Sequence, residues 1–200
     1  MSKQVEFHFD FGSPNAYLAH KAVPGIEKRT GIAFTYVPVL LGGIFKATNN
    51  VSPMIANQGI KNKGEYAMLE IERFIATHKL TKFKFNAHFP VNTLQIMRGA
   101  VAAEMDAMLP DYIDAVMPAM WEASRKMDDP DTIKAVLDEA GIDGTHILAR
   151  IQEPDVKAKL AANTQDAVTR GAFGIPTFFV DGDIYFGKDR LRDVEDAITA

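Results

Sequence analysis

Residues 5–18 read Val5-Glu6-Phe7-His8-Phe9-Asp10-Phe11-Gly12-Ser13-Pro14-Asn15-Ala16-Tyr17-Leu18. The alternation of apolar and polar side chains predicts a β-strand over Val5 to Phe9. A helix is expected over Asn15 to Lys28, because a proline suits the first helical turn, where its missing N–H costs nothing. Ser13 therefore lies where a strand gives way to the amino end of a helix. Free N–H groups and the positive end of the helix dipole favour an anion at such a position.

A second strand is expected directly after this helix. Gly31 ends the helix, and the stretch Ala33-Phe34-Thr35-Tyr36-Val37-Pro38 follows it. Because a helical crossover joins the two strands, they should run parallel in one sheet.

The periodicity of the chain becomes helical from Gly42 onward. In the range Leu94–Leu109, apolar side chains recur at the spacing that places them on one helix face. The other helices expected in this part of the chain span Glu65–Thr77, Asp111–Arg125, Asp131–Ala140 and Val156–Thr169.

The chain then returns to β structure. Strands are expected over Thr177–Val180 and Ile184–Phe186, because Asp181-Gly182 is a strong two-residue hairpin turn. A helix over Arg190–Thr199 follows. The order βαβ, helices, ββα is typical of an α/β class protein with a thioredoxin-like fold and an all-helical insertion. We expect a discontinuous thioredoxin-like domain over 1–40 and 172–200 and a mainly helical insertion domain over 41–171.

The composition limits the classes of function. The 200 residues are 47% hydrophobic and 24% charged, with a net charge of −4, so a basic surface for nucleic acid is not expected. No apolar run reaches the length that spans a membrane. Met1-Ser2-Lys3-Gln4-Val5-Glu6 contains no cationic segment followed by an apolar stretch. We therefore expect no signal peptide and predict a cytoplasmic location.

The sequence contains no cysteine, which excludes thiol–disulfide exchange by the protein's own groups. Thioredoxin-like sites hold a sulfur at the helix tip, where this chain has Ser13. Any sulfur must therefore arrive on a ligand. The histidines are scattered without the spacing of metal ligands, and no metal site is expected.

Local sequence alone favours a simpler role for Ser13, that of the N-cap of the helix with Pro14 in the first turn. A hydrolase nucleophile is a weaker interpretation. Gly12-Ser13-Pro14 is not a G-x-S-x-G turn, and no histidine can be placed beside the hydroxyl.

Two further segments could bind a ligand. Gly174-Ile175-Pro176-Thr177 suits a cis proline that leaves the Ile175 N–H and C=O free to pair with an extended peptide. The alternative is a trans proline that begins an edge strand. Phe186-Gly187-Lys188-Asp189-Arg190 precedes the last helix and could bind a carboxylate. The alternative here is that Asp189 caps the helix and Lys188 is solvated.

Five ordered segments together resemble the 2-hydroxychromene-2-carboxylate isomerases, which are related to kappa-class glutathione transferases and to the DsbA-like branch of the thioredoxin superfamily. The resemblance covers essentially the whole chain. The segments are Phe9–Leu18, Gly42–Thr48, Phe89–Leu94, Gly171–Thr177 and Phe186–Arg190.

The resemblance implies a glutathione site. Ser13 matches the serine that activates the glutathione thiol, and it is the expected catalytic residue. Ile175 matches the residue whose backbone pairs with the cysteinyl part. The other positions that match glutathione contacts are Asn50, Lys63, Phe186, Gly187, Lys188 and Asp189. Lys188 departs from the family pattern, in which asparagine or serine is usual. Lys46 and Asn92 lie in segments that border the organic substrate.

The implied activity is a glutathione-dependent isomerisation. It would interconvert 2-hydroxychromene-2-carboxylate-type substrates and trans-o-hydroxybenzylidenepyruvate-type products, in the setting of aromatic hydrocarbon catabolism. The expected partners are glutathione, a small aromatic carboxylate and a second copy of the chain in a homodimer. Two alternatives stay open: a kappa-class-like glutathione transferase, and a non-catalytic thiol- or peptide-binding module.

Overall fold

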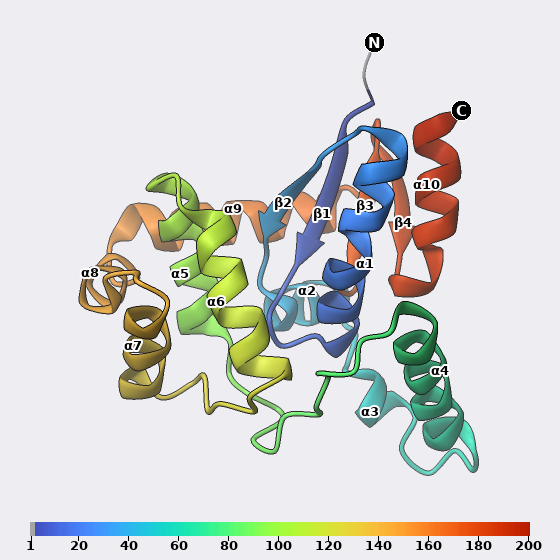
Figure 1. Cartoon of the computed structure of the whole chain (residues 1–200), viewed down its shortest axis with the longest axis horizontal. Helices are drawn as coiled ribbons and strands as arrows, with labels where there is room; N and C mark the ends of the chain where they lie inside the picture. The colour runs from blue at the N-terminus through green and yellow to red at the C-terminus, as the bar shows by residue number, and fades with distance from the viewer. Residues whose placement is uncertain (1–2) are drawn as a thin grey trace.

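A computed structural model describes residues 3–200 and contains one four-stranded sheet. Its strands are β1 (Val5–Phe9), β2 (Phe34–Pro38), β3 (Thr177–Val180) and β4 (Asp183–Phe186). They lie in the order β2-β1-β3-β4; β1 and β2 are parallel, and the other pairs are antiparallel (Figure 1). The expected βαβ…ββα order, and with it the fold class, is confirmed. Residues 1 and 2 lie outside the described residues. The predicted range 1–40 and the N-terminal segment both begin with them.

The alternation in β1 separates two environments. Phe7 and Phe9 are fully buried, and the Phe7 ring stacks on Phe178 of β3 with the centroids 4.9 Å apart. On the other face, Glu6 accepts a hydrogen bond from Arg170 at 2.8 Å and pairs with His8 at 2.7 Å. The aromatic face forms the core of the sheet, and the polar face is covered by the end of a later helix.

The first helix, α1 (Pro14–Thr30), extends slightly beyond the expected range Asn15–Lys28 at both ends, and Gly31 ends it as predicted. Gly31 follows it with φ +73°, the left-handed conformation that glycine adopts without steric cost, and its N–H donates to the Glu27 carbonyl. Helix α1 packs beside the C-terminal helix α10 (Leu191–Thr199), in front of the sheet in Figure 1.

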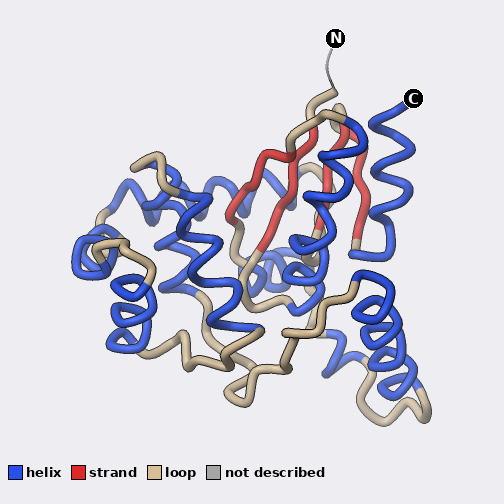
Figure 2. The backbone as a smooth tube through the Cα atoms, viewed as in Figure 1, coloured by secondary structure: helices blue, strands red, loops and turns tan. Residues whose placement is uncertain are grey.

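The middle of the chain consists of helices and the loops that join them. Its helices are α2 (Leu41–Thr48), α3 (Pro53–Ala56), α4 (Lys63–His78), α5 (Leu94–Met105), α6 (Leu109–Trp121), α7 (Pro130–Glu139), α8 (Gly144–Arg150) and α9 (Pro154–Thr169). Figures 1 and 2 show α5 to α8 grouped on one side of the sheet and α3 and α4 on the other, joined by a long loop. The prediction of two separate domains stays a prediction.

Three of these helices differ from the expected set. Helices α2, α3 and α8 were not predicted from the sequence. Helix α5 was expected to continue to Leu109, whereas it ends at Met105 and Ala107 follows with φ +58°. The chain turns there because the Met108 N–H bonds back to the Ala103 carbonyl, after which α6 begins.

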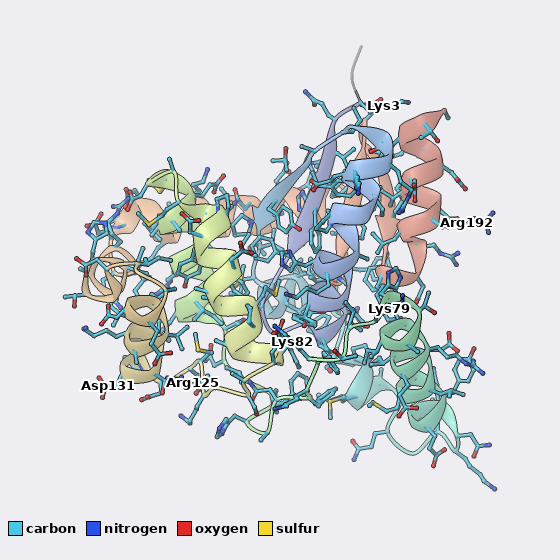
Figure 3. All side chains as sticks on the ribbon, viewed as in Figure 1. Lys3, Lys79, Lys82, Arg125, Asp131 and Arg192 are labelled. Atoms are coloured by element: carbon cyan, nitrogen blue, oxygen red, sulfur yellow. The ribbon has the colours of Figure 1, made fainter. Side chains whose placement is uncertain are left out.

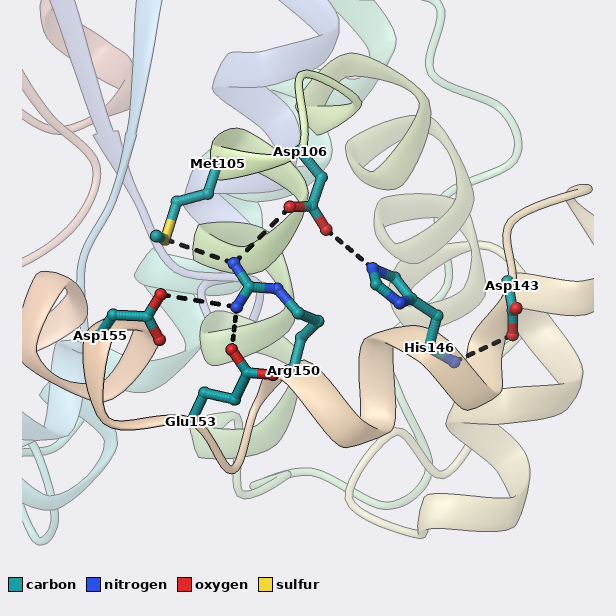
Figure 4. A network of polar contacts seen from close by, with 7 residues as sticks. All are labelled: Met105, Asp106, Asp143, His146, Arg150, Glu153 and Asp155. Carbon is teal, nitrogen blue, oxygen red and sulfur yellow. Dashed lines mark hydrogen bonds and ion pairs between the residues drawn. The ribbon is translucent and has the colours of Figure 1, made fainter.

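Charged side chains cover the outer surface (Figure 3), and one network of them connects α5 to the α8–α9 turn (Figure 4). Arg150 forms ion pairs with Asp106 at 3.6 Å, with Asp155 at 3.5 Å and with Glu153. Asp106 also contacts His146 at 2.9 Å. The network holds the turn between α8 and α9 against the carboxyl end of α5.

Among residues 3–200, no helix combines the length and the apolar character needed to cross a bilayer.

Candidate active site at the amino end of α1

Ser13 is the N-cap of α1 and also contacts the opposite segment of the site. Its side chain is buried, and Oγ accepts a hydrogen bond from the Ala16 N–H at 3.2 Å. The same hydroxyl donates to the Ile175 carbonyl at 3.1 Å. The N-cap interpretation is therefore correct, and it does not exclude contact with a ligand. Since Ser13 bonds to Ala16 and Ile175 rather than to a histidine, nothing in its surroundings favours a hydrolase nucleophile.

The Ile175–Pro176 peptide bond is cis, so the alternative of a trans proline is wrong. Ile175 is buried beside Ser13. Within residues 3–200 its N–H has no hydrogen-bond acceptor, while its carbonyl is taken by the Ser13 hydroxyl. This N–H is therefore available to donate to a ligand carbonyl at this place.

The loop after β4 lies against the segment that leads to Pro176. The Gly187 N–H donates to the Pro176 carbonyl at 2.9 Å, and Gly187 has φ +93°. The Phe186 ring lies 4.4 Å from that of Phe173. A Cβ on Gly174 would lie 2.8 Å from the Phe186 ring, so a larger residue there would displace that ring. Phe186 and Gly187 thus lie beside the segment 173–176, which contains Ile175.

The structure contradicts the alternative in which Asp189 caps the helix and Lys188 is solvated, whereas ligand binding by this loop stays a prediction. Lys188 is buried rather than solvated: its Nζ lies 2.5 Å from Asp189 Oδ1 and 5.0 Å above the Phe74 ring of α4. Asp189 is exposed, and no side chain caps the short 3₁₀ turn Lys188–Arg190 or α10. The buried ammonium group of Lys188 and the exposed carboxylate of Asp189 therefore form an ion pair next to Gly187.

The remaining predicted positions are less closely connected. The Asn50 amide donates to the Phe173 carbonyl at 2.9 Å, which joins the end of α2 to the segment before Pro176. Lys46 and Lys63 are exposed, on α2 and at the start of α4. Asn92 is exposed and accepts from the Leu94 N–H at 3.1 Å. Across the described part of the chain, no hydrogen bond or ion pair joins these last three to Ser13.

Asp10 and Thr93 were not predicted as site residues. The Asp10 carboxylate is completely buried and accepts from the Gly12 N–H and the Leu41 N–H, both at 2.8 Å, and from the Thr93 side chain. Burial raises the pKa of Asp10, and these three hydrogen bonds oppose that rise. Asp10 thereby connects the Ser13 loop to the beginnings of α2 and α5. The sequence did contain one indication of this role: Asp10 is an acidic residue that directly follows a largely apolar strand.

Gly12 permits this close assembly. A Cβ at Gly12 would lie 2.9 Å from the Thr93 methyl group and 3.3 Å from Asp10 Oδ1. Behind the loop, Trp121 Nε1 donates to the Phe11 carbonyl at 2.8 Å. The loop that carries Ser13 is therefore fixed on both sides.

The aromatic residues before Pro90 pack on the core. Phe83 stacks on buried Trp121, with centroids 6.1 Å apart and ring planes 12° apart, and Phe85 and Phe89 also contact Trp121. Phe85 is 40% exposed. Core packing thus accounts for most of this group.

Together these contacts define a class of site. A helix N-terminus, a hydroxyl and an unpaired backbone N–H meet at one place, with a charged pair at the loop after β4. Such a site can stabilise a small anion and pair with an extended peptide-like ligand. It has the layout expected of a thioredoxin-like site, with Ser13 in place of a cysteine.

The chain belongs to the family described as DSBA-like thioredoxin domain, which matches residues 4–199. It is 27% identical over 195 residues to a 2-hydroxychromene-2-carboxylate isomerase of Sphingobium xenophagum, covering 98% of this chain and 97% of that one. It is 29% identical over 201 residues to glutathione S-transferase kappa 1 of Rattus norvegicus, covering 94% and 87%.

Solved structures agree with this placement. The structure of a 2-hydroxychromene-2-carboxylate isomerase superimposes with a TM-score of 0.83 and 25% identity, covering 98% of this chain and 94% of that one. A probable DsbA oxidoreductase of Streptomyces coelicolor, at TM-score 0.74 and 19% identity over 98% and 88%, shares the fold. The resemblance stated from the sequence is confirmed, and so is the expectation of an enzyme similar to these isomerases.

Proposed function

We propose that this chain is a glutathione-dependent isomerase in which Ser13 stabilises the thiolate. Its substrates would be of the 2-hydroxychromene-2-carboxylate type, and its products of the trans-o-hydroxybenzylidenepyruvate type. One observation carries the proposal: the Ser13 hydroxyl, at the amino end of α1, lies 3.1 Å from the carbonyl of Ile175, whose own N–H is unpaired among residues 3–200.

The described residues fit glutathione at this place. The unpaired Ile175 N–H would donate to a carbonyl of the cysteinyl part, as an added strand does. The exposed Asp189 carboxylate would pair with the ammonium group of the γ-glutamyl end. Phe186, the last residue of β4, and Gly187, which follows it, would lie beside that end. Asn50 and Lys63 would contact the remaining polar groups. When bound, glutathione supplies the thiol nucleophile that a chain without cysteine lacks.

Ser13 has a single hydroxyl proton, and the Ile175 carbonyl accepts it in this structure. We expect the hydroxyl to turn toward sulfur when the ligand binds. The Ile175 carbonyl then becomes free to accept an N–H from the ligand backbone. Ser13 would thus exchange one acceptor for another while keeping the Ala16 N–H satisfied through Oγ.

Binding of the aromatic carboxylate is assigned to Lys46 and Asn92. Lys46 is an exposed cation on α2, whose first N–H is held by Asp10, and Asn92 begins the segment held by the same carboxylate. Lys46 would orient the carboxylate, and Asn92 a polar group of the substrate. A cytoplasmic homodimer acting in aromatic hydrocarbon catabolism completes the proposal.

A kappa-class-like transferase is the second candidate, because the rat kappa 1 protein is 29% identical over nearly the full length. Parallel assays with 1-chloro-2,4-dinitrobenzene and with a hydroxychromene carboxylate separate the two. Faster conjugation than isomerisation would favour the transferase. Glutathione binding without turnover of either would favour the non-catalytic module.

The first prediction concerns Ser13→Ala. Turnover should fall by about a hundredfold, the usual effect of removing one hydrogen-bond donor to an anionic centre. The measurement is kcat for isomerisation at saturating glutathione. Ser13→Gly is the matched control, because glycine keeps most of the N-cap preference and also lacks the hydroxyl. The Ser13→Gly variant should be as inactive as Ser13→Ala but more stable. Full turnover in either variant would overturn the proposal.

A further inference from the structure

A cavity of about 290 Å³ lies where α2, α5 and α9 meet, apart from the Ser13 site. Its walls are mostly apolar. Among the lining residues are Leu40, Ala47, Leu94, Leu160, Ala161 and Val168. Gly43 lets α2 approach α9, because a Cβ there would lie 3.0 Å from the Thr164 methyl group.

The uncharged polar residues of this cavity are already engaged. The Thr164 hydroxyl accepts from the Leu40 N–H at 2.9 Å and donates to the Leu160 carbonyl at 2.7 Å. The Gln165 amide donates to the Thr169 hydroxyl at 3.3 Å. Neither of these residues carries a charge, so recognition of a charged ligand falls to the two cationic side chains that line the cavity, Arg98 of α5 and Lys157 of α9.

Arg98 and Lys157 are both half-buried, and within residues 3–200 neither forms an ion pair. By contrast, Lys159, which is also half-buried on α9, pairs with Glu104 at 3.4 Å. Two partly desolvated cations without a counter-charge beside an apolar cavity attract an anion with an apolar body.

We propose that this cavity binds a small carboxylate that carries a single aromatic ring. The ring lies between α2 and α9, and the carboxylate accepts hydrogen bonds from Arg98 and Lys157. The size agrees, because a cavity of about 150 Å³ already holds benzene, and about 290 Å³ leaves room for a short acid side chain. A guanidinium binds a carboxylate in two-point geometry, and the ammonium adds a second charge.

This pocket shares none of its lining residues with the positions assigned to glutathione. Helix α2 separates the two: Gly43 and Ala47 line the pocket, whereas Asn50, just beyond the helix, contacts Phe173 of the Ser13 site. The inference therefore does not depend on the proposed function. It assigns a second ligand site to the chain.

The test is calorimetric titration of the full chain with trans-cinnamate and with the uncharged cinnamyl alcohol. We expect cinnamate to bind the native chain at least tenfold more tightly than the alcohol. The double variant Arg98→Gln, Lys157→Gln should lose that tenfold preference. Arg192→Gln removes one charge from α10, far from α9 in Figure 3, and should leave binding unchanged. Ala161→Phe, at an exposed helical position, should block both ligands by filling the cavity.

Three outcomes would overturn the proposal. One is absence of cinnamate binding to the native chain. Another is unchanged cinnamate affinity in the folded double variant. The third is loss of cinnamate binding in Lys46→Gln with retention in the double variant, which would place the probe at the Ser13 site instead.

Discussion

The Ser13 Oγ atom makes two hydrogen bonds, because it lies between the first turn of α1 and Ile175. As an acceptor it caps α1, and as a donor it contacts Ile175 from the other end of the sequence. The cap fixes the hydroxyl at the positive end of the helix dipole, where an anion is stabilised. The local role and the proposed catalytic role therefore support each other.

Asp10 positions the loop that carries this hydroxyl, because its carboxylate accepts from the Gly12 N–H. We predict that Asp10→Asn lowers the free energy of unfolding by about 1–3 kcal/mol, because an amide group can accept at one side but repels an N–H at the other. Denaturant unfolding measures the change, and glutathione affinity should fall as well. Asp111→Asn, an exposed aspartate in the first turn of α6, is the control and should change stability by less than about 0.5 kcal/mol. Equal effects would contradict this role.

His20 makes stability depend on pH. Burial, and then the charge of Lys21, lower the pKa of His20 from 6.5 to about 4. The unfolded chain therefore takes up a proton below about pH 6.5, whereas the folded chain does so only near 4. Stability contributed by this group is present above pH 6.5 and is lost as the pH falls to 4, by up to roughly 3 kcal/mol.

The measurement is the free energy of unfolding at several pH values for the native chain and for His20→Phe, which keeps an aromatic ring beside Tyr36. The variant should lose most of the decline between pH 6.5 and 4. An identical decline in both proteins would show that other groups cause it.

At the scale of helices and strands, the elements that could be predicted from the sequence are those whose apolar residues recur at a regular spacing. The strands, α1 and α9 were found with small errors at their ends. Helix α2 was missed because Leu41-Gly42-Gly43 resembles a loop; Gly43 is needed there for the approach to α9, which only the tertiary structure shows. The end of α5 was misplaced because Met108 continues the apolar face although the backbone has already turned.

The crossing of α5 and α6 also depends on a glycine. A Cβ on Gly99 would lie 2.7 Å from Tyr112 Cζ, and the Tyr112 hydroxyl donates to the Ile96 carbonyl. We predict that Gly99→Ala destabilises the fold by about 1–3 kcal/mol, despite the better helix propensity of alanine. Gly25→Ala in α1 is the control, because its Cβ would meet only the end of Arg29 at 3.4 Å. It should stabilise by about 0.5–1 kcal/mol. Stabilisation by both, in thermal unfolding, would contradict this packing.

For the whole molecule, element order was enough to predict that Ser13 and Ile175 meet, because a βαβ…ββα chain places both at one end of the sheet. The burial of Lys188 could not be predicted, since it requires Phe74 from the helical segment. Asp10 was passed over for a similar reason, because its partners Leu41 and Thr93 are distant in sequence. The order of the elements thus predicts where the candidate site lies, whereas the contacts that support it come from the helices between β2 and β3.

The most direct measurement is the pH titration of the glutathione thiol in complex with the chain, followed by the ultraviolet absorbance of the thiolate. In the native complex its pKa should be about 2 units lower than in free glutathione, which corresponds to roughly 2.7 kcal/mol of thiolate stabilisation. In Ser13→Ala most of that shift should disappear. A bound thiol that titrates like free glutathione, or an equal shift in both proteins, would contradict the assignment of Ser13 as the group that holds the thiolate.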